Sequence, residues 1–331
     1  MQEKPTYNAD YFIQGILQKD RIIFSKAITL IESTKPSDEV IAEAIIEACL
    51  QTQKTSKRIA ITGSPGAGKS TFINAFGKQL LDNNNSVAVL AIDPSSSISK
   101  GSILGDKTRM EDLISHPKCY IRPTASSSTL GGVARKTRET IILCEAFGFD
   151  YILVETVGVG QSETLVKNMT DLFLLLLLPN AGDELQGIKR GIMEMADIIL
   201  INKSEKENEV IAKISATQVK HALHLFSENE KGWLPQVLNI SSLENIGLDK
   251  LQQTIDSYFL QLETTGFMEQ NRQQQQLHWL NESIVSYIQN KVQNDETIAA
   301  IKSSLENKIR FKEIDANKAA KLLVAKIFNK E

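Results

Sequence analysis

The chain has few cysteines and almost no excess of charge of either sign. Its three cysteines, Cys49, Cys119 and Cys144, are odd in number and far apart in 331 residues. They form neither a disulfide framework nor a Cys-x-x-Cys metal pair, which favours a reducing compartment. The 37 Lys and Arg nearly balance the 40 Asp and Glu, giving a formal net charge of -3. That balance argues against a basic face that wraps nucleic acid or binds an anionic membrane.

Long apolar runs are also missing. The longest, Leu172–Leu178, is far short of the roughly 20 residues that a membrane-spanning helix needs. The polar N-terminus has no apolar signal core behind it. Hydrophobic residues at 42% and charged residues at 23% are typical of a folded chain. We therefore expect a cytoplasmic, unprocessed protein with no membrane partner and no nucleic-acid partner.

The pattern of apolar and polar residues along the sequence predicts three segments. Residues 1–56 have helical spacing and form an N-terminal extension, and residues 261–331 form a helical C-terminal arm. Residues 57–260 alternate short apolar runs with amphipathic stretches, which predicts an α/β domain with a mostly parallel sheet covered by helices on both faces. The apolar runs are Arg58–Thr62, Val87–Ile92, Cys119–Ile121, Tyr151–Val154, Leu172–Leu178, Ile198–Ile201 and Val237–Ile240.

A glycine-rich loop carries the strongest chemical signal. It matches G-x-x-x-x-G-K-[ST] in full, between a predicted strand and a predicted helix. In this motif backbone N–H groups surround phosphate oxygens, the lysine reaches the β- and γ-phosphates, and the serine hydroxyl binds Mg²⁺. An incidental glycine-rich turn is the weaker alternative. The residues expected to contact the nucleotide here are Gly63, Ser64, Pro65, Gly66, Ala67, Gly68, Lys69, Ser70 and Thr71.

Three carboxylates lie where strands or loops would meet such a site. Glu155 ends a strand and is followed by Gly158, in the pattern of a Walker B strand that holds Mg²⁺ and contacts the γ-phosphate. Asp93 ends another strand, on the ligand side of a parallel sheet, although it could equally cap the turn before Pro94. Asp106 lies in a polar loop and is either a metal ligand or a solvated side chain.

Two further segments point to guanine. Asn202-Lys203-Ser204-Glu205 follows a strand and resembles Asn-Lys-x-Asp, whose carboxylate accepts hydrogen bonds from N1–H and the exocyclic amine of guanine. Adenine lacks both donors there, so a buried carboxylate rejects it. Ser241, Ser242 and Leu243 follow the last strand, where a Ser-Ala-x loop often covers the base. We therefore predict GTP and GDP as ligands.

Together these motifs resemble the methylmalonyl-CoA mutase-associated GTPases, the MeaB/MMAA family. The resemblance is dense from about residue 58 to residue 250, and the last of the matching segments is its most diagnostic part. The segments are Gly63–Thr71, Ala91–Ser95, Gly101–Met110, Thr129–Ala134, Glu155–Glu163 and Gly182–Lys189. Glu205 and Ser242 stand where the family usually has Asp and Ala.

The resemblance implies a SIMIBI-class P-loop GTPase that forms a homodimer through its C-terminal arm. It implies Mg²⁺ held around Ser70, Asp93, Asp106 and Glu155, switch regions near 101–116 and 156–163, and a third mobile loop near 180–190. It also implies a chaperone that binds an adenosylcobalamin-dependent mutase, gates its cofactor loading by GTP hydrolysis and protects it from inactivation. Some members carry an older label as kinases or ATPases of arginine and ornithine transport.

The groups expected to act in hydrolysis are Lys69, Asp106, Glu155, Gly158 and Lys189. Val159 rather than Gln follows Gly158, so no water-positioning side chain is evident. We expect slow intrinsic hydrolysis that a partner accelerates by ordering loops or inserting charge, with Lys189 and Arg109 as candidate charge donors.

Two other functions stay open at this point. A nickel-chaperone GTPase would need a Cys and His cluster, whereas this chain has three scattered cysteines and four histidines, His116, His221, His224 and His278. A metabolite kinase or transport ATPase would need adenine selectivity and an acceptor pocket.

Overall fold

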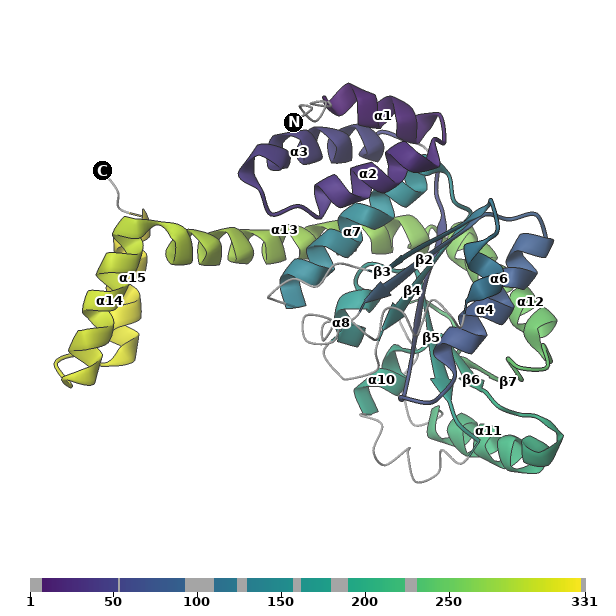
Figure 1. The fold of residues 1–331 in the computed structure, drawn as a ribbon. Helices are drawn as coiled ribbons and strands as arrows, with labels where there is room; N and C mark the ends of the chain where they lie inside the picture. Colours follow the sequence, from purple (N-terminus) through teal and green to yellow (C-terminus); the bar gives the residue numbers. More distant parts are fainter. Residues whose placement is uncertain are drawn as a thin grey trace. The chain divides into compact units, whose positions relative to one another are not determined.

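The computed structural model describes residues 8–52, 54–92, 110–123, 130–156, 162–179, 190–223 and 231–328. Contacts divide the chain into two compact units, one ending at Arg272 and one beginning at Gln273. Figure 1 shows the elements in chain order. The predicted sites Asp93, Asp106, Gly158 and Lys189, together with Arg109, lie outside the described residues.

A parallel sheet of seven strands forms the centre of the first unit. Its strand order is β3-β2-β4-β1-β5-β6-β7, and every neighbouring pair is parallel. The predicted α/β class with a parallel sheet is thereby confirmed. The strands are β1 (Lys57–Gly63), β2 (Val87–Ile92), β3 (Cys119–Pro123), β4 (Tyr151–Thr156), β5 (Leu172–Leu177), β6 (Ile198–Ile201) and β7 (Gln236–Asn239).

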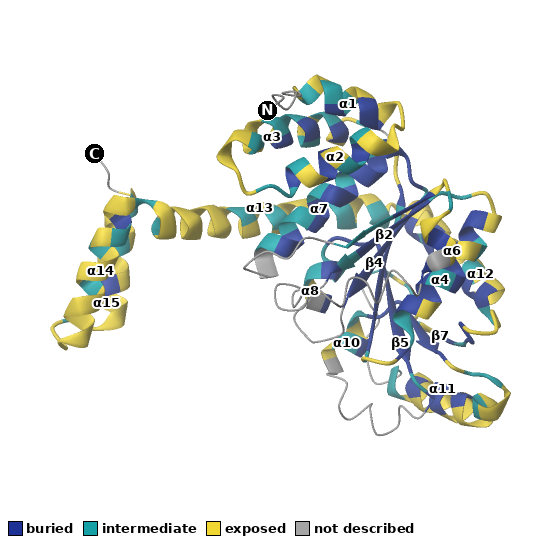
Figure 2. Ribbon diagram, in the orientation of Figure 1, coloured by how far each residue is buried: buried dark blue, intermediate teal, exposed yellow. Residues whose placement is uncertain are grey.

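Helices cover both faces of this sheet, which explains why its strands are apolar on both sides. All six residues of β5 are buried, so the leucine-rich run predicted as a buried strand is one. On one face α4 (Lys69–Asp82) and α12 (Leu248–Thr265) share a core cluster with alternate strand residues such as Ile59 and Ile61. On the other lie α7 (Leu130–Phe147) and α8 (Ser162–Lys167) (Figure 1). Figure 2 shows the central strands buried and the outer helix faces exposed.

Residues 9–50 form three helices that pack on one another and on α7. They are α1 (Ala9–Leu17), α2 (Arg21–Ile31) and α3 (Pro36–Leu50). The fully buried Phe24 of α2 lies 4.4 Å from the ring of Phe147 and 4.8 Å from that of Tyr120, measured between centroids. This aromatic packing joins the N-terminal helices to the edge of the sheet.

Further helices belong to the first unit, and others form the second. The former are α6 (Glu111–Ile114), α10 (Arg190–Met195), the 3-10 helix η1 (Lys206–Asn208) and α11 (Glu209–Leu223). Helix α13 (Phe267–Asn294) crosses the boundary, and α14 (Glu296–Arg310) packs against α15 (Ala316–Phe328) within the second unit. None of the helices among the described residues is long and apolar enough to cross a membrane.

Candidate functional site

The glycine-rich loop joins the end of β1 to the start of α4. Gly68 has a φ of 88°, and a Cβ added to it would lie 2.7 Å from Nδ2 of Asn202. A Cβ on Gly63 would lie 2.4 Å from the carbonyl oxygen of Leu176 on β5. Both positions therefore require glycine, because the backbone approaches a neighbouring element and Gly68 adopts a left-handed conformation.

Lys69 and Ser70 occupy the first turn of α4. The Lys69 ammonium donates to the carbonyl oxygens of Gly63 and Ser64, at 2.8 and 3.3 Å, which holds it at the start of the loop. The Ser70 side chain is largely buried. The Ser64 hydroxyl oxygen is buried and has no hydrogen-bond partner among the described residues. A helix N-terminus with a lysine beside it attracts an anion, so this turn can hold phosphate groups.

Glu155 lies near the carboxyl end of β4 and is 8% exposed. It pairs with Ile61 of β1 and Ala91 of β2. Strand side chains alternate between faces, so Glu155 shares a face with Leu153, which packs in the same cluster as Phe72 of α4. Its carboxylate and the Ser70 hydroxyl therefore belong to one side of the sheet. A carboxylate and a hydroxyl are hard oxygen donors, which fit Mg²⁺.

Asn202, directly after β6, joins the phosphate loop to the predicted base loop. Its Nδ2 donates to the carbonyl oxygen of Ala67 at 2.8 Å. Its Oδ1 accepts from the backbone N–H of Ser242 at 3.1 Å and from the Ser242 hydroxyl at 2.8 Å. The residue is 1% exposed, so all of these bonds are made away from water. The predicted phosphate and guanine motifs are thereby brought together, although they lie more than 130 residues apart in the chain.

Glu205 and Ser241 are also in contact. The Ser241 hydroxyl donates to Oε1 of Glu205 at 2.9 Å and accepts from the backbone N–H of Glu244 at 3.1 Å. Ser241 is fully buried, while Leu243 is 75% exposed. Lys203 is exposed and has a φ of 58°. The carboxylate that the sequence assigns to guanine is therefore held by a hydroxyl from the adjacent loop.

Two buried threonines were not singled out from the sequence. The Thr156 hydroxyl donates to the Thr62 hydroxyl at 2.8 Å, and both residues are almost completely buried. Their sequence signal is weak, because Thr62 ends the apolar run Arg58–Thr62 but Thr156 lies two residues beyond the run Tyr151–Val154. No group of three or more His, Cys, Asp and Glu within the described ranges is placed to hold a metal ion.

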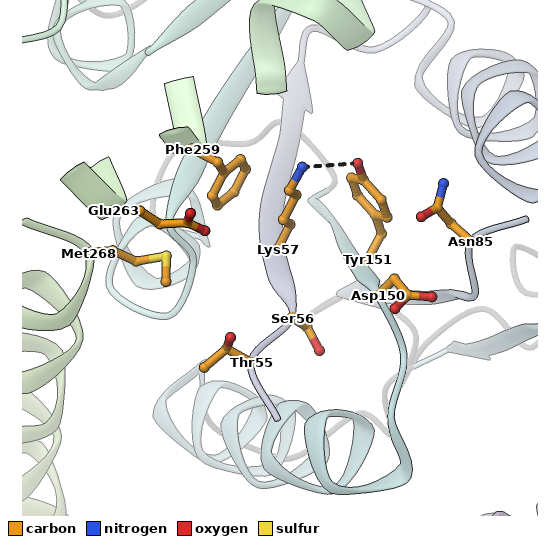
Figure 3. Close-up of a pocket in the computed structure, with 9 residues that line it drawn as sticks. All are labelled: Thr55, Ser56, Lys57, Asn85, Asp150, Tyr151, Phe259, Glu263 and Met268. Atoms are coloured by element: carbon orange, nitrogen blue, oxygen red, sulfur yellow. Dashed lines mark hydrogen bonds between the residues drawn. The ribbon is translucent and has the colours of Figure 1, made fainter. Parts of the chain in front are cut away.

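A cavity at the end of the sheet opposite the glycine-rich loop was also not expected. It has a volume of about 250 Å³ and lies at the amino ends of β1 and β4 (Figure 3). The Lys57 ammonium donates to Asp256 at 2.6 Å and to the Tyr151 hydroxyl at 3.3 Å. Burial alone would lower the pKa of Lys57, but these partners outweigh it and raise the pKa. The cavity therefore lies at the other end of β1 from the glycine-rich loop, and its Lys57 ammonium already has Asp256 and Tyr151 as hydrogen-bond partners.

Comparison with known proteins identifies the family. A probable GTPase of Mycobacterium tuberculosis is 44% identical over 305 residues, covering 92% of this chain and 91% of that protein. The mouse mitochondrial methylmalonic aciduria type A homolog is 39% identical over 334 residues, covering 98% and 80%. A crystal structure described as an LAO/AO transport system kinase superposes with a TM-score of 0.77 at 32% identity, covering 98% of this chain and 99% of that one. The family model described as methylmalonyl-CoA mutase-associated GTPase MeaB matches residues 24–297. The chain therefore belongs to the MeaB family of methylmalonyl-CoA mutase-associated GTPases.

Proposed function

We propose that this GTPase is a chaperone of an adenosylcobalamin-dependent acyl-CoA mutase, with methylmalonyl-CoA mutase as the leading candidate. It gates cofactor loading by GTP hydrolysis and protects the mutase from inactivation. Family membership over residues 24–297 supports the class of partner. The observation that carries the nucleotide part is Asn202, whose side chain ties the phosphate loop to the base loop.

The nucleotide would bind along the carboxyl edge of the sheet, where ligands of open parallel sheets lie. Gly63–Thr71 would surround the phosphates, with Lys69 turning from the loop carbonyls toward the β- and γ-phosphates. Glu205, with Lys203 beside it, would accept the guanine donors while Ser241 holds its carboxylate. Ser242 and Leu243 would lie over the base.

Mg²⁺ would supply charge neutralisation at the phosphates. Ser70 and Glu155 are the described oxygen donors suited to it, since they belong to one side of the sheet. Asp93 and Asp106 stay predicted ligands outside the described residues, as do the hydrolytic roles of Gly158 and Lys189. We further propose that intrinsic hydrolysis is slow and that the partner accelerates it.

A second copy of the chain is a further proposed partner. We propose a cytoplasmic homodimer formed through the arm predicted over residues 261–331. Side chains on α13 support this proposal because Leu277, Leu280 and Ile284 are 62%, 57% and 47% exposed in a single chain. Apolar side chains that are exposed in a row along one helix favour burial against a partner.

Affinity purification tests the mutase role. The tagged full chain is loaded with a non-hydrolysable GTP analogue or with GDP, and the bound acyl-CoA mutase is identified by mass spectrometry. We expect mutase recovery to depend on which nucleotide is loaded, and to be lost with Lys69→Ala, which removes the phosphate-binding ammonium. Nucleotide-dependent thermal stabilisation without any B12-dependent mutase in the eluate would refute the chaperone role and leave the GTP site standing.

A transport-associated kinase is the second candidate, because the superposed crystal structure is described as an LAO/AO transport system kinase. Its nucleotide would be ATP, so thermal shift with GDP and with ADP separates the two functions. We expect stabilisation by GDP alone. Equal or greater stabilisation by ADP would favour the kinase.

A further inference from the structure

The backbone pairing between strands β1 and β4 ends one residue before Thr156, the last residue of β4. Strands β1 and β4 pair from Lys57–Tyr151 up to Ile61–Glu155. Beyond that point β1 continues to pair with β5, as far as Gly63–Leu176. Strand β4 continues to pair with β2, ending at Thr156. Among the described residues the backbone ladder therefore forks between β1 and β4 just where β1 enters the glycine-rich loop.

One side-chain hydrogen bond bridges this fork. Thr156 and Thr62 are the next residues after the last backbone pair, and the Thr156 hydroxyl donates to the Thr62 hydroxyl at 2.8 Å. They are 0% and 1% exposed, so water does not compete for the bond. By alternation they project from the face opposite Glu155, toward α7 and α8, and helix α8 contacts both strands. The bond therefore leaves the catalytic face unobstructed.

Each threonine adjoins a group assigned to hydrolysis. Thr62 precedes Gly63, whose carbonyl oxygen accepts a hydrogen bond from the Lys69 ammonium. Thr156 follows Glu155. The hydroxyl pair therefore links the strand that leads into the phosphate loop to the strand that carries Glu155.

We propose that Thr62 and Thr156 are positioning residues for GTP hydrolysis. Their hydrogen bond fixes the Glu155 carboxylate relative to the phosphate loop, and neither side chain touches the nucleotide. This inference rests on the proposed placement of the nucleotide at Gly63–Thr71 and Glu155. A shift of about 1 Å at a reacting group can lower a rate by on the order of 10²-fold. The remaining ladder limits the shift here, so we expect about a tenfold fall.

Steady-state kinetics on isosteric variants of the full chain test the proposal. We expect Thr156→Val and Thr62→Val to lower kcat for GTP about tenfold while KM and the dissociation constant for GDP change less than twofold. Thr156→Ser and Thr62→Ser keep a hydroxyl and should keep kcat within about twofold of the unsubstituted protein. The double variant Thr62→Val with Thr156→Val leaves no buried hydroxyl without a partner, so its urea midpoint should recover while kcat stays low.

A matched control separates positioning from stability. Thr137 in α7 is fully buried, and its hydroxyl donates to the carbonyl oxygen of Val133 at 2.9 Å in the same helix. We expect Thr137→Val, which also replaces a buried threonine hydroxyl with a methyl group, to leave kcat unchanged. Valine variants at the fork that stay folded with normal kcat, or a double variant with restored kcat, would overturn the proposal. Glu155→Gln with normal kcat would instead refute the placement of the site.

Discussion

A buried ion pair at the amino ends of the strands gives the largest stability effect that we predict. Asp171, just before β5, is 1% exposed. Its carboxylate accepts from Arg272 at 2.9 Å (Nε) and 2.6 Å (Nη2), and from the Arg58 backbone N–H at 3.1 Å. Burial alone would lower the pKa of Arg272, but Asp171 and then Glu145 outweigh it and raise the pKa. Arg272 therefore stays charged and depends on its carboxylate partners.

The change Asp171→Asn keeps the size of the side chain and removes its charge. The guanidinium of Arg272 then loses its bidentate partner and keeps Glu145, at 3.3 Å, and the Ser56 carbonyl oxygen, at 2.7 Å. Breaking a buried pair from one side costs about 3–5 kcal/mol. At about 2–4 °C per kcal/mol for a unit of this size, the melting temperature should fall by about 6–20 °C. Urea unfolding followed by circular dichroism, without nucleotide, measures the same loss.

Two comparisons make this prediction refutable. The double change Asp171→Asn with Arg272→Met removes both charges of this pair and keeps an acceptor for the Arg58 backbone N–H, so part of the lost stability should recover. Glu209→Gln removes an ion pair with Lys213 whose side chains are 56% and 67% exposed, and should leave the midpoint unchanged. If Asp171→Asn unfolds at the same urea concentration as Glu209→Gln, the reasoning is wrong.

Three further predictions concern the nucleotide site and the thiols. Asn202→Ala removes three buried hydrogen bonds, worth about 1 kcal/mol each, so the dissociation constant for GDP should rise by up to about 150-fold; an unchanged value in a fluorescent-GDP titration would contradict this. Gly68→Ala should weaken GDP binding more than Gly66→Ala, because both have a positive φ but only the first would place a Cβ against Asn202; equal titration curves would contradict it. A thiol reagent at pH 8 should label none of Cys49, Cys119 and Cys144 in the native protein and all three in urea. Burial blocks access to the three thiols and raises their pKa values, to about 12 for Cys49 and Cys119. Labelling of the native protein would contradict this prediction.

The sequence was sufficient to predict the sheet and the family, for identifiable reasons. Strands buried on both faces must be apolar throughout, so runs such as Leu172–Leu178 could be assigned without knowledge of their neighbours. The glycine-rich loop has a fixed spacing that few other structures require. The family resemblance is confirmed by the match over residues 24–297. The three segment boundaries and the roles of the site residues stay predictions.

Contacts between distant segments could not be predicted in the same way. Asn202 was assigned to guanine recognition, but its bond to Ala67 depends on β6 lying two strands from β1. Thr62 and Thr156 become neighbours only because β4 inserts beside β1, out of chain order. Arg272 and Asp171 are separated by about a hundred residues. Strand order, which local periodicity does not encode, decides the first two pairs, and the position of Arg272 on α13 decides the third.

The shared use of Asn202 has a thermodynamic consequence for ligand fragments. Its amide nitrogen is committed to the glycine-rich loop and its amide oxygen to Ser242, in the loop that we predict to lie beside the base. Ordering either loop restrains the Asn202 side chain. Guanosine and pyrophosphate, if bound separately, would therefore each cost the conformational entropy of that side chain, whereas the intact nucleotide would cost it once. We therefore expect two such fragments to bind cooperatively, because one amide holds both loops.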